Sequence, residues 1–299
     1  MKEKKILKYC VADVFTNKSY KGNPLAVVFT NGNLELEQYE NIAREFGYSE
    51  SSFVYYSRAQ KALNVRSFTP AGFEVAGAGH NLLGAVCATI LKEMDIFKEQ
   101  GSNRFVIMKE NPIPLFVGFD NTNRLPVVKM LQKPAVIGKS VPVEIIAKAI
   151  GITIDDLQVQ NFTPTIVQTE VAHIMVAVKT PEALDKIKPD NKLLIEISKQ
   201  YRFEGFYCFA LMDETDGTIA QSRFFNPLIG IDEDAATGTA AGPLAGILYN
   251  KHLIQQNKEY RVLQGVKLNQ PSLIEVMVKE DGILVGGSSV ITMEGNIYL

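Results

Sequence analysis

Two stretches of the sequence predict helices that are apolar on every side. Residues 82–91 read LLGAVCATIL, and residues 240–249 read AAGPLAGILY. A helix without a polar face has to be enclosed within a domain rather than lie on its surface. Pro243 is tolerated best in a first turn, so the second helix is expected to start at 239–241. Each half of the chain is therefore expected to build a shell around one central helix.

Short apolar runs separated by turn residues predict strands around both helices. Asp216-Gly217 predicts the turn of a hairpin, whereas residues 133–140 are expected to be a connector. The acidic residues at 232–234 are expected to lie in a loop before the second helix. The expected strands are 7–12, 26–29, 53–56, 64–69, 104–108, 115–119, 127–130, 165–169, 172–178, 205–212, 218–225, 260–263, 272–279, 283–286 and 290–293, and further helices are expected at 36–46, 143–150, 181–187 and 192–201.

The pattern predicts an α+β (mixed α/β) protein of two similar domains. Its 299 residues are enough for two ordinary domains. We expect the first domain to span 1–130 and to hold Glu50 and His80. The second would span 131–299 and hold Asp234 to Thr239, with the final strand free to return to the first domain.

Composition excludes several classes of protein. The net charge of −2 gives no broad basic surface for nucleic acid or anionic lipid. The chain also has no run of 18 consecutive apolar residues, the length that a helix needs to cross a membrane. The three cysteines, Cys10, Cys87 and Cys208, lie far apart in apolar runs, which indicates reduced and buried thiols. We therefore expect a cytoplasmic protein that binds neither nucleic acid nor membranes.

Common motifs for cofactors, metals and activated nucleophiles are incomplete. Residues 77–82 (GAGHNL) lack the third glycine of a dinucleotide site, and Ser49 lacks the glycine that would close a nucleophile elbow. His80, His173 and His252 are scattered and stand in no metal-binding pattern. We expect no metal and no cofactor, which leaves general acid–base chemistry as the main enzymatic option.

Both apolar helices begin with small and polar residues. Gly79 precedes the first, and Thr237-Gly238-Thr239 precede the second. The first turn of a helix has backbone N–H groups without partners and a partial positive charge, so it can hold a carboxylate. We expect the two helix starts to face each other across one active site.

Three side chains are candidates for acid–base chemistry: Glu50 before a strand, His80 at the first helix start and Asp234 before the second. Each also has an ordinary structural interpretation. Glu50 could be a solvated loop residue and His80 a core or capping residue. Asp234 could be an acid favoured by the helix dipole, and Thr237 and Thr239 could be plain caps.

Several ordered segments together resemble the PhzF family of phenazine-biosynthesis-like proteins, whose fold is shared with diaminopimelate epimerase. The similarity extends nearly end to end. The segments are VADVFTNKSYKGNPLAVVF (11–29), SESSFV (49–54), RSFTPAGFEVAGAGHNLLGA (66–85), RFFNPLIGIDEDAATGTAAGPLAGIL (223–248) and ILVGGSSVITMEG (283–295). The resemblance implies two similar domains, each a curved, mostly antiparallel sheet rolled around a central helix. It also implies an active site in the cleft between them, cofactor-free isomerisation and a homodimer.

Matched to the family's motifs, the chain has its catalytic residues at Glu50, His80 and Asp234. The family's Ala-Gly-His corresponds to 78–80, and its Glu-Asp-Pro-x-Thr-Gly-Ser corresponds to 233–239. The resemblance therefore implies that Gly79, Thr237, Gly238 and Thr239 bind the substrate.

The chain departs from the family pattern around this site. Ala235 replaces a proline, Thr239 replaces a serine, and Asn81 follows the histidine where the family has proline. Other departures are Ala76-Gly77 for Pro-Phe and Asn269-Gln270 for Gly-Arg. These changes allow a substrate other than the phenazine precursor. Ala78 and Thr237 stand where the related epimerase has thiols, which disfavours racemisation by two cysteines.

We expect a cofactor-independent isomerase that moves a proton on a small carboxylated substrate, with Glu50 as base and then acid. Two alternatives remain open at this stage. One is a non-catalytic protein that binds a small ligand on the same scaffold. The other is an epimerase or racemase that pairs Glu50 with a second acid.

Overall fold

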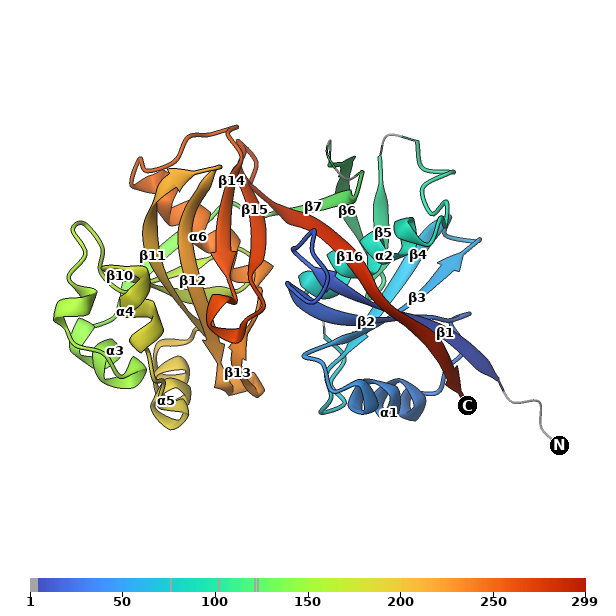
Figure 1. Ribbon diagram of the computed structural model, residues 1–299, viewed down its shortest axis with the longest axis horizontal. Helices are drawn as coiled ribbons and strands as arrows, with labels where there is room; N and C mark the ends of the chain where they lie inside the picture. The colour runs from blue at the N-terminus through green and yellow to red at the C-terminus, as the bar shows by residue number, and fades with distance from the viewer. Residues whose placement is uncertain (1–4, 76, 102, 121, 123) are drawn as a thin grey trace. The chain divides into compact units, whose positions relative to one another are not determined.

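A computed structural model of the full chain describes residues 5–75, 77–101, 103–120, 122 and 124–299 (Figure 1). Ala76, one of the departures from the family pattern, lies outside these residues. The chain folds into two compact units. Unit 1 comprises 1–130 and 286–299, and unit 2 comprises 131–285.

Unit 1 encloses helix α2 (His80–Leu91) in a sheet (Figure 1). The first ten residues of α2 are all buried, as expected for a helix that is apolar on every side. Neighbouring strands follow the order β1-β2-β3-β4-β5-β6-β7-β16, and β16 also pairs with β1, so the sheet closes on itself. The elements are β1 (Ile6–Val14), β2 (Asn23–Phe29), α1 (Leu36–Phe46), β3 (Ser51–Ser57), β4 (Ala62–Phe68), β5 (Phe105–Met108), β6 (Asn111–Phe119), β7 (Pro126–Gln132) and β16 (Ile283–Tyr298).

Unit 2 packs a sheet around helix α6 (Gly238–Asn250), which contacts β15, β10, β9 and β8. The order is β15-β14-β12-β11-β10-β9-β8, with β13 paired to β12. Most pairs are antiparallel, and β10–β11 and β12–β14 are parallel. The elements are β8 (Val136–Ser140), α3 (Val143–Ile150), β9 (Thr165–Gln168), β10 (Ala172–Val178), α4 (Pro181–Lys186), α5 (Asn191–Tyr201), β11 (Gly205–Thr215), β12 (Thr218–Asn226), β13 (Ile231–Asp234), β14 (Tyr260–Gln264) and β15 (Ser272–Val278).

The mixed α/β architecture expected from the sequence is confirmed. The predicted hairpin is present: Thr215 pairs with Thr218, and Asp216 and Gly217 have φ of 52° and 78°. A two-residue turn of this type requires positive φ at both positions. The expected end of α1 is also confirmed, because Gly47 adopts the left-handed conformation after Phe46.

Four local expectations are wrong. Residues 136–140 form β8 rather than a connector. Every residue of β8 is exposed, so the strand lacks the alternation of apolar and polar residues that would predict it from the sequence. Residues 231–234 form β13 rather than a loop. The last two expected strands are one, β16. Gly286 does not interrupt this strand. A Cβ at this position would collide with the carbonyl of Val128, so the glycine allows the Val128 backbone to approach the strand closely.

The fourth error concerns the start of α6. The helix begins at Gly238, so Pro243 lies inside it, beyond the first turn. Proline has no N–H to donate to the carbonyl of Thr239, four residues earlier. Tertiary packing overrides this cost, since residues 240–248 of the helix are buried.

The cysteines are buried free thiols, as the sequence predicts. Cys10, Cys87 and Cys208 are free and buried, and burial raises the pKa of each thiol to about 12. Such thiols stay protonated and are poor nucleophiles. Within the described part of the chain, no helix has the length and apolar character needed to cross a bilayer.

Gly242→Ala is expected to destabilise the protein by about 1–3 kcal/mol, although alanine normally favours a helix. A Cβ at this position would collide with Oε1 of Gln132. That oxygen is fixed, because it accepts from Thr169 Oγ1 (2.9 Å) while Gln132 Nε2 donates to the Gly238 carbonyl (2.9 Å). Urea unfolding measures the change. Gly118→Ala is the control, since nothing lies within 4 Å of its added Cβ, and an equal loss there would contradict the explanation.

Candidate active site

The start of α2 is shaped by the side chain of Asn81. Asn81 is fully buried, and its Oδ1 accepts from the backbone N–H of Gly79 (2.7 Å) and of Leu82 (2.8 Å). Its Nδ2 donates to the carbonyl of Gly77 (3.0 Å). Ser52 Oγ from β3 donates to the Asn81 carbonyl (3.0 Å). These bonds hold the loop before α2 in one conformation.

Glu50 and His80 lie together at this helix start. Glu50 immediately precedes β3, and its Oε2 is 3.6 Å from Nδ1 of His80. On the other side of the ring, Ser49 Oγ is 3.5 Å from Nε2. The side chains of His80 and Glu50 are only 9% and 17% exposed. The ring is therefore enclosed, while the carboxyl group keeps some access to solvent.

His80 is neutral at physiological pH. Burial lowers the pKa of the ring to about 4. The contact is thus between the carboxyl group of Glu50 and a neutral imidazole rather than an ion pair. A neutral imidazole has one N–H donor and one acceptor nitrogen, so it can orient a partner and exchange a proton with it.

The start of α6 is built around Asp234 and Thr237. Asp234 ends β13, and Thr237 is the N-cap residue. Thr237 Oγ1 donates to Asp234 Oδ2 (2.6 Å) and does not cap its own helix. The simple capping interpretation of Thr237 is therefore wrong.

A fully buried amide, Gln264 of β14, holds this second helix start. Its Oε1 accepts from the Thr237 N–H (3.2 Å), and its Nε2 donates to the Asp234 carbonyl (2.9 Å) and lies 3.1 Å from Thr237 Oγ1. Gln264 therefore fixes both Asp234 and Thr237, the role that Asn81 has at the other helix start.

Both helices leave backbone donors open. Among the described residues, nothing accepts from the N–H of His80 or Asn81 in α2, or of Gly238 or Thr239 in α6. The hydroxyl of Thr239, a half-buried residue, likewise has no partner in the described part of the chain. Pairs of adjacent N–H groups at a helix start bind anions such as carboxylates.

Comparison with known proteins assigns the family. A family model described as phenazine biosynthesis-like protein (PhzC-PhzF) matches residues 12–295. The chain belongs to the phenazine biosynthesis-like family. The resemblance expected from the sequence is thus confirmed. The matched region contains every candidate residue at both helix starts.

Relatives within this family are named as isomerases. The trans-2,3-dihydro-3-hydroxyanthranilate isomerase of Pseudomonas aeruginosa is 30% identical over 300 residues, covering 98% of this chain and 99% of that protein. A PhzF-family protein of Bacillus anthracis has a TM-score of 0.87 at 25% identity, covering 99% and 100% of the two chains. The expected enzyme class, a PhzF-like isomerase, is confirmed.

The fold is also shared beyond the phenazine biosynthesis-like family. A hydroxyproline epimerase of Agrobacterium vitis has a TM-score of 0.63 at 10% identity, covering 100% of this chain and 94% of that one. At that identity the likeness concerns the fold alone. It agrees with the epimerase-like fold expected from the sequence.

The structure groups the candidate residues by unit. Unit 1 brings Glu50, Gly79 and His80 to the start of α2. Unit 2 brings Asp234, Thr237, Gly238 and Thr239 to the start of α6. Within the described residues, no group of three or more His, Cys, Asp or Glu side chains could hold a metal ion.

Neighbouring acids in β13 have structural partners. Glu233 forms two bonds with the guanidinium of Arg223 (2.8 and 2.7 Å), and Asp232 accepts from Asn191 Nδ2 (2.7 Å). Both residues belong to a strand and have side-chain partners outside α6, so neither is an acid of the first turn of that helix. Asp234 alone of the three contacts the helix start.

Sequence reasoning missed the two buried amides that shape the site. Asn81 was noted as a departure from the family proline, but its role in shaping the loop before α2 was not predicted. Gln264 carries no local signal, since it lies 27 residues after Thr237 on a separate strand. Only the pairing of β14 with β12 brings it to the start of α6.

The buried histidines predict a loss of stability in mild acid. His80 and His173 have folded-state pKa values of about 4 and about 3, lowered from 6.5 by burial. Above pH 6.5 both rings are neutral in the folded and unfolded states and stability is unaffected. As the pH falls from 6.5 toward 4, only the unfolded state gains protons, so the free energy of unfolding falls.

For His80 this loss should reach roughly 3 kcal/mol at pH 4. Urea unfolding at pH 7 and pH 4 measures it, and His80→Asn is the comparison. The wild type should lose more stability between these two pH values than the variant does. An equal loss in both proteins would show that His80 is not held neutral by burial.

Proposed function

We propose that the protein is a cofactor-independent isomerase that moves a proton on a small carboxylated substrate by general acid–base catalysis. The observation that carries this proposal is the Glu50 carboxylate, 3.6 Å from a neutral His80, at a helix start with two open N–H donors. As the sequence resemblance implies, the substrate would bind in a cleft between the two helix starts.

In the proposed reaction, Glu50 takes a proton from a carbon of the substrate and becomes a carboxylic acid. The electron pair of the broken C–H bond moves into the conjugated system of the substrate, and charge develops on an oxygen. Open N–H groups at the helix starts stabilise that oxygen. Glu50 then returns the proton to a different carbon, so the enzyme is restored and the substrate is isomerised.

The other residues would position the substrate. His80 presents a neutral nitrogen to Glu50 and would orient its carboxyl group during both transfers. The unpaired hydroxyl of Thr239 would donate a hydrogen bond, and the N–H groups of Gly238 and Thr239 would hold the substrate carboxylate. Asp234, fixed by Thr237 and Gln264, would accept a hydrogen bond from a donor group of the substrate.

A carboxylated substrate agrees with the name of the Pseudomonas aeruginosa relative, whose substrate is an anthranilate derivative. The changes at Ala235, Thr239 and Asn81 lie at the helix starts, so the substrate of this chain need not be the same. A homodimer, implied by the resemblance, would show twice the chain mass of 33.1 kDa in light scattering.

The test is a screen of small unsaturated carboxylic acids, each incubated with the enzyme in D2O and examined by NMR. Isomerised product formed by a single shared base should carry deuterium at the new C–H position in a fraction of molecules. Binding without exchange or isomerisation, in a screen that includes trans-2,3-dihydro-3-hydroxyanthranilate, would favour the non-catalytic alternative. Inversion of a stereocentre without a double-bond shift would favour an epimerase.

A further inference from the structure

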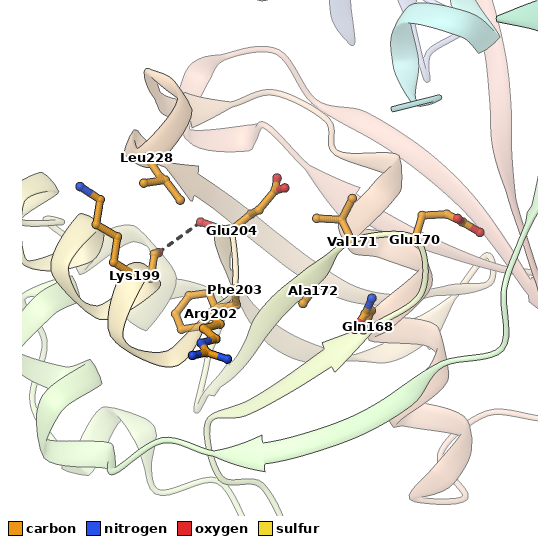
Figure 2. A pocket seen from close by; sticks show the side chains of 10 residues that line it. Gln168, Glu170, Val171, Ala172, Lys199, Arg202, Phe203, Glu204 and Leu228 are labelled. Carbon is orange, nitrogen blue, oxygen red and sulfur yellow. Dashed lines mark hydrogen bonds between the residues drawn. The ribbon is translucent and has the colours of Figure 1, made fainter. Parts of the chain in front are cut away.

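A pocket lies in unit 2 (Figure 2). Its volume is about 430 Å³, within the range of small-molecule sites. It lies between the C-terminal end of α5, the turn between β9 and β10, the start of β11 and the short 3₁₀ segment Pro227–Ile229. None of Asp234, Thr237, Gly238 or Thr239 lines it.

One wall of the pocket is apolar and the rim is charged. Val171, Ala172, Phe203 and Leu228 supply the apolar surface. Lys199 and Glu204 supply opposite charges, and in Figure 2 they lie on either side of Leu228. Neither of these two charged groups has an ion-pair partner among the described residues.

The Glu204 carboxyl group lies in a poorly solvated position. Burial raises its pKa, and a hydrogen bond with the side chain of Asn226 partly opposes that rise. Asn226 is 1% exposed, and its Oδ1 has no hydrogen-bond partner in the described part of the chain. A carboxylate that is partly desolvated and has no ion-pair partner is stabilised when a cationic group binds beside it.

Two other charged residues line the pocket. One forms an ion pair and the other points away from Glu204. Glu170 pairs with Lys133 (3.2 Å). Arg202 points away from Glu204 in Figure 2. Lys199 and Glu204 are thus lining groups of opposite charge that have no ion-pair partner among the described residues.

The backbone around these groups is fixed. Ser198 Oγ donates to the Glu204 carbonyl (3.2 Å), and the Glu204 N–H donates to the Ala172 carbonyl (2.9 Å). The Arg202 N–H donates to the Ser198 carbonyl (2.8 Å), which closes α5. The backbone at the end of α5 and the start of β11, which carries Lys199 and Glu204, is thus held by hydrogen bonds.

We propose that this pocket binds a small amino acid with an apolar side chain. The ligand ammonium would lie on Glu204, its carboxylate on Lys199, and its side chain against Val171, Phe203 and Leu228. A zwitterion matches the pocket because it neutralises both unpaired groups at once. This site would be separate from the proposed isomerase site and does not depend on it.

L-Leucine is the probe, titrated into the intact protein by isothermal calorimetry. Two analogues test the charges: 3-methylbutylamine lacks the carboxylate, and 4-methylpentanoate lacks the ammonium. Leucine should bind, and each analogue should bind roughly tenfold more weakly or worse. Absence of leucine binding, or equal binding of an analogue, would overturn the proposal.

Variants locate the binding site. Lys199→Ala and Glu204→Gln should each weaken leucine binding roughly tenfold or more. Lys192→Ala and Glu196→Gln are the matched controls, since both residues lie on α5 and neither lines the pocket. Glu50→Gln should bind leucine as the wild type does. Binding that changes in Glu50→Gln, or stays unchanged in Lys199→Ala and Glu204→Gln, would place leucine elsewhere and overturn the proposal.

Discussion

Glu50→Gln is expected to reduce kcat by about 10²–10⁴-fold while leaving substrate affinity nearly unchanged. Glutamine has the shape of glutamate but cannot take a proton from carbon. The amide still fits beside His80, whose ring is neutral and carries no charge that would require a carboxylate partner. Turnover is measured with the substrate found in the deuterium screen, and affinity by calorimetry.

Glu45→Gln is the matched control for this experiment. Glu45 is an exposed residue of α1, and the same chemical change there should leave kcat at the wild-type value. Full activity in Glu50→Gln would remove Glu50 from the mechanism. A loss of affinity as large as the loss of kcat would instead make Glu50 a substrate-binding residue.

The apolar helices were the most predictable part of the fold. A helix without a polar face is stable only in the interior of a domain, and α2 and α6 are buried along most of their length. β8 shows the opposite case. All five of its residues are exposed, and it exists because its backbone pairs with β9. A strand held by backbone pairing alone has no side-chain pattern for sequence reasoning to detect.

The candidate site also has parts that the sequence predicted and parts that it did not. The residues of local motifs were found at once, because Gly79-His80 and Thr237-Gly238-Thr239 are adjacent in sequence to the helices that they begin. Glu50 was a candidate because it stands before a strand, but one acid in that position has no specific signal, so its catalytic role came from the family resemblance. For Thr237 the resemblance implied substrate binding and a plain cap was the alternative. The alternative fails because the hydroxyl turns to Asp234 instead of its own helix.

Gln264→Leu is expected to lower the free energy of unfolding by about 2–6 kcal/mol, because it leaves two buried backbone groups without partners at about 1–3 kcal/mol each. These are the Thr237 N–H, now 3.2 Å from Gln264 Oε1, and the Asp234 carbonyl, now 2.9 Å from Nε2. Leucine fills a similar volume, so the loss reports on hydrogen bonding rather than on a cavity. Urea unfolding measures it, and Gln255→Leu, an exposed change, is the control.

A purely structural role and a positioning role for Gln264 differ in what happens to the folded variant. If Gln264 positions the start of α6, the Thr237 amide should lose hydrogen-exchange protection while the amides of Ala240 and Ala241, which donate to the Thr237 carbonyl, keep theirs. Turnover should fall at temperatures where the variant is fully folded, because the amide that holds the Thr237 N–H and the Asp234 carbonyl is missing. Wild-type turnover in the folded variant would mean that the Thr237–Asp234 bond alone is sufficient to set the geometry of this helix start.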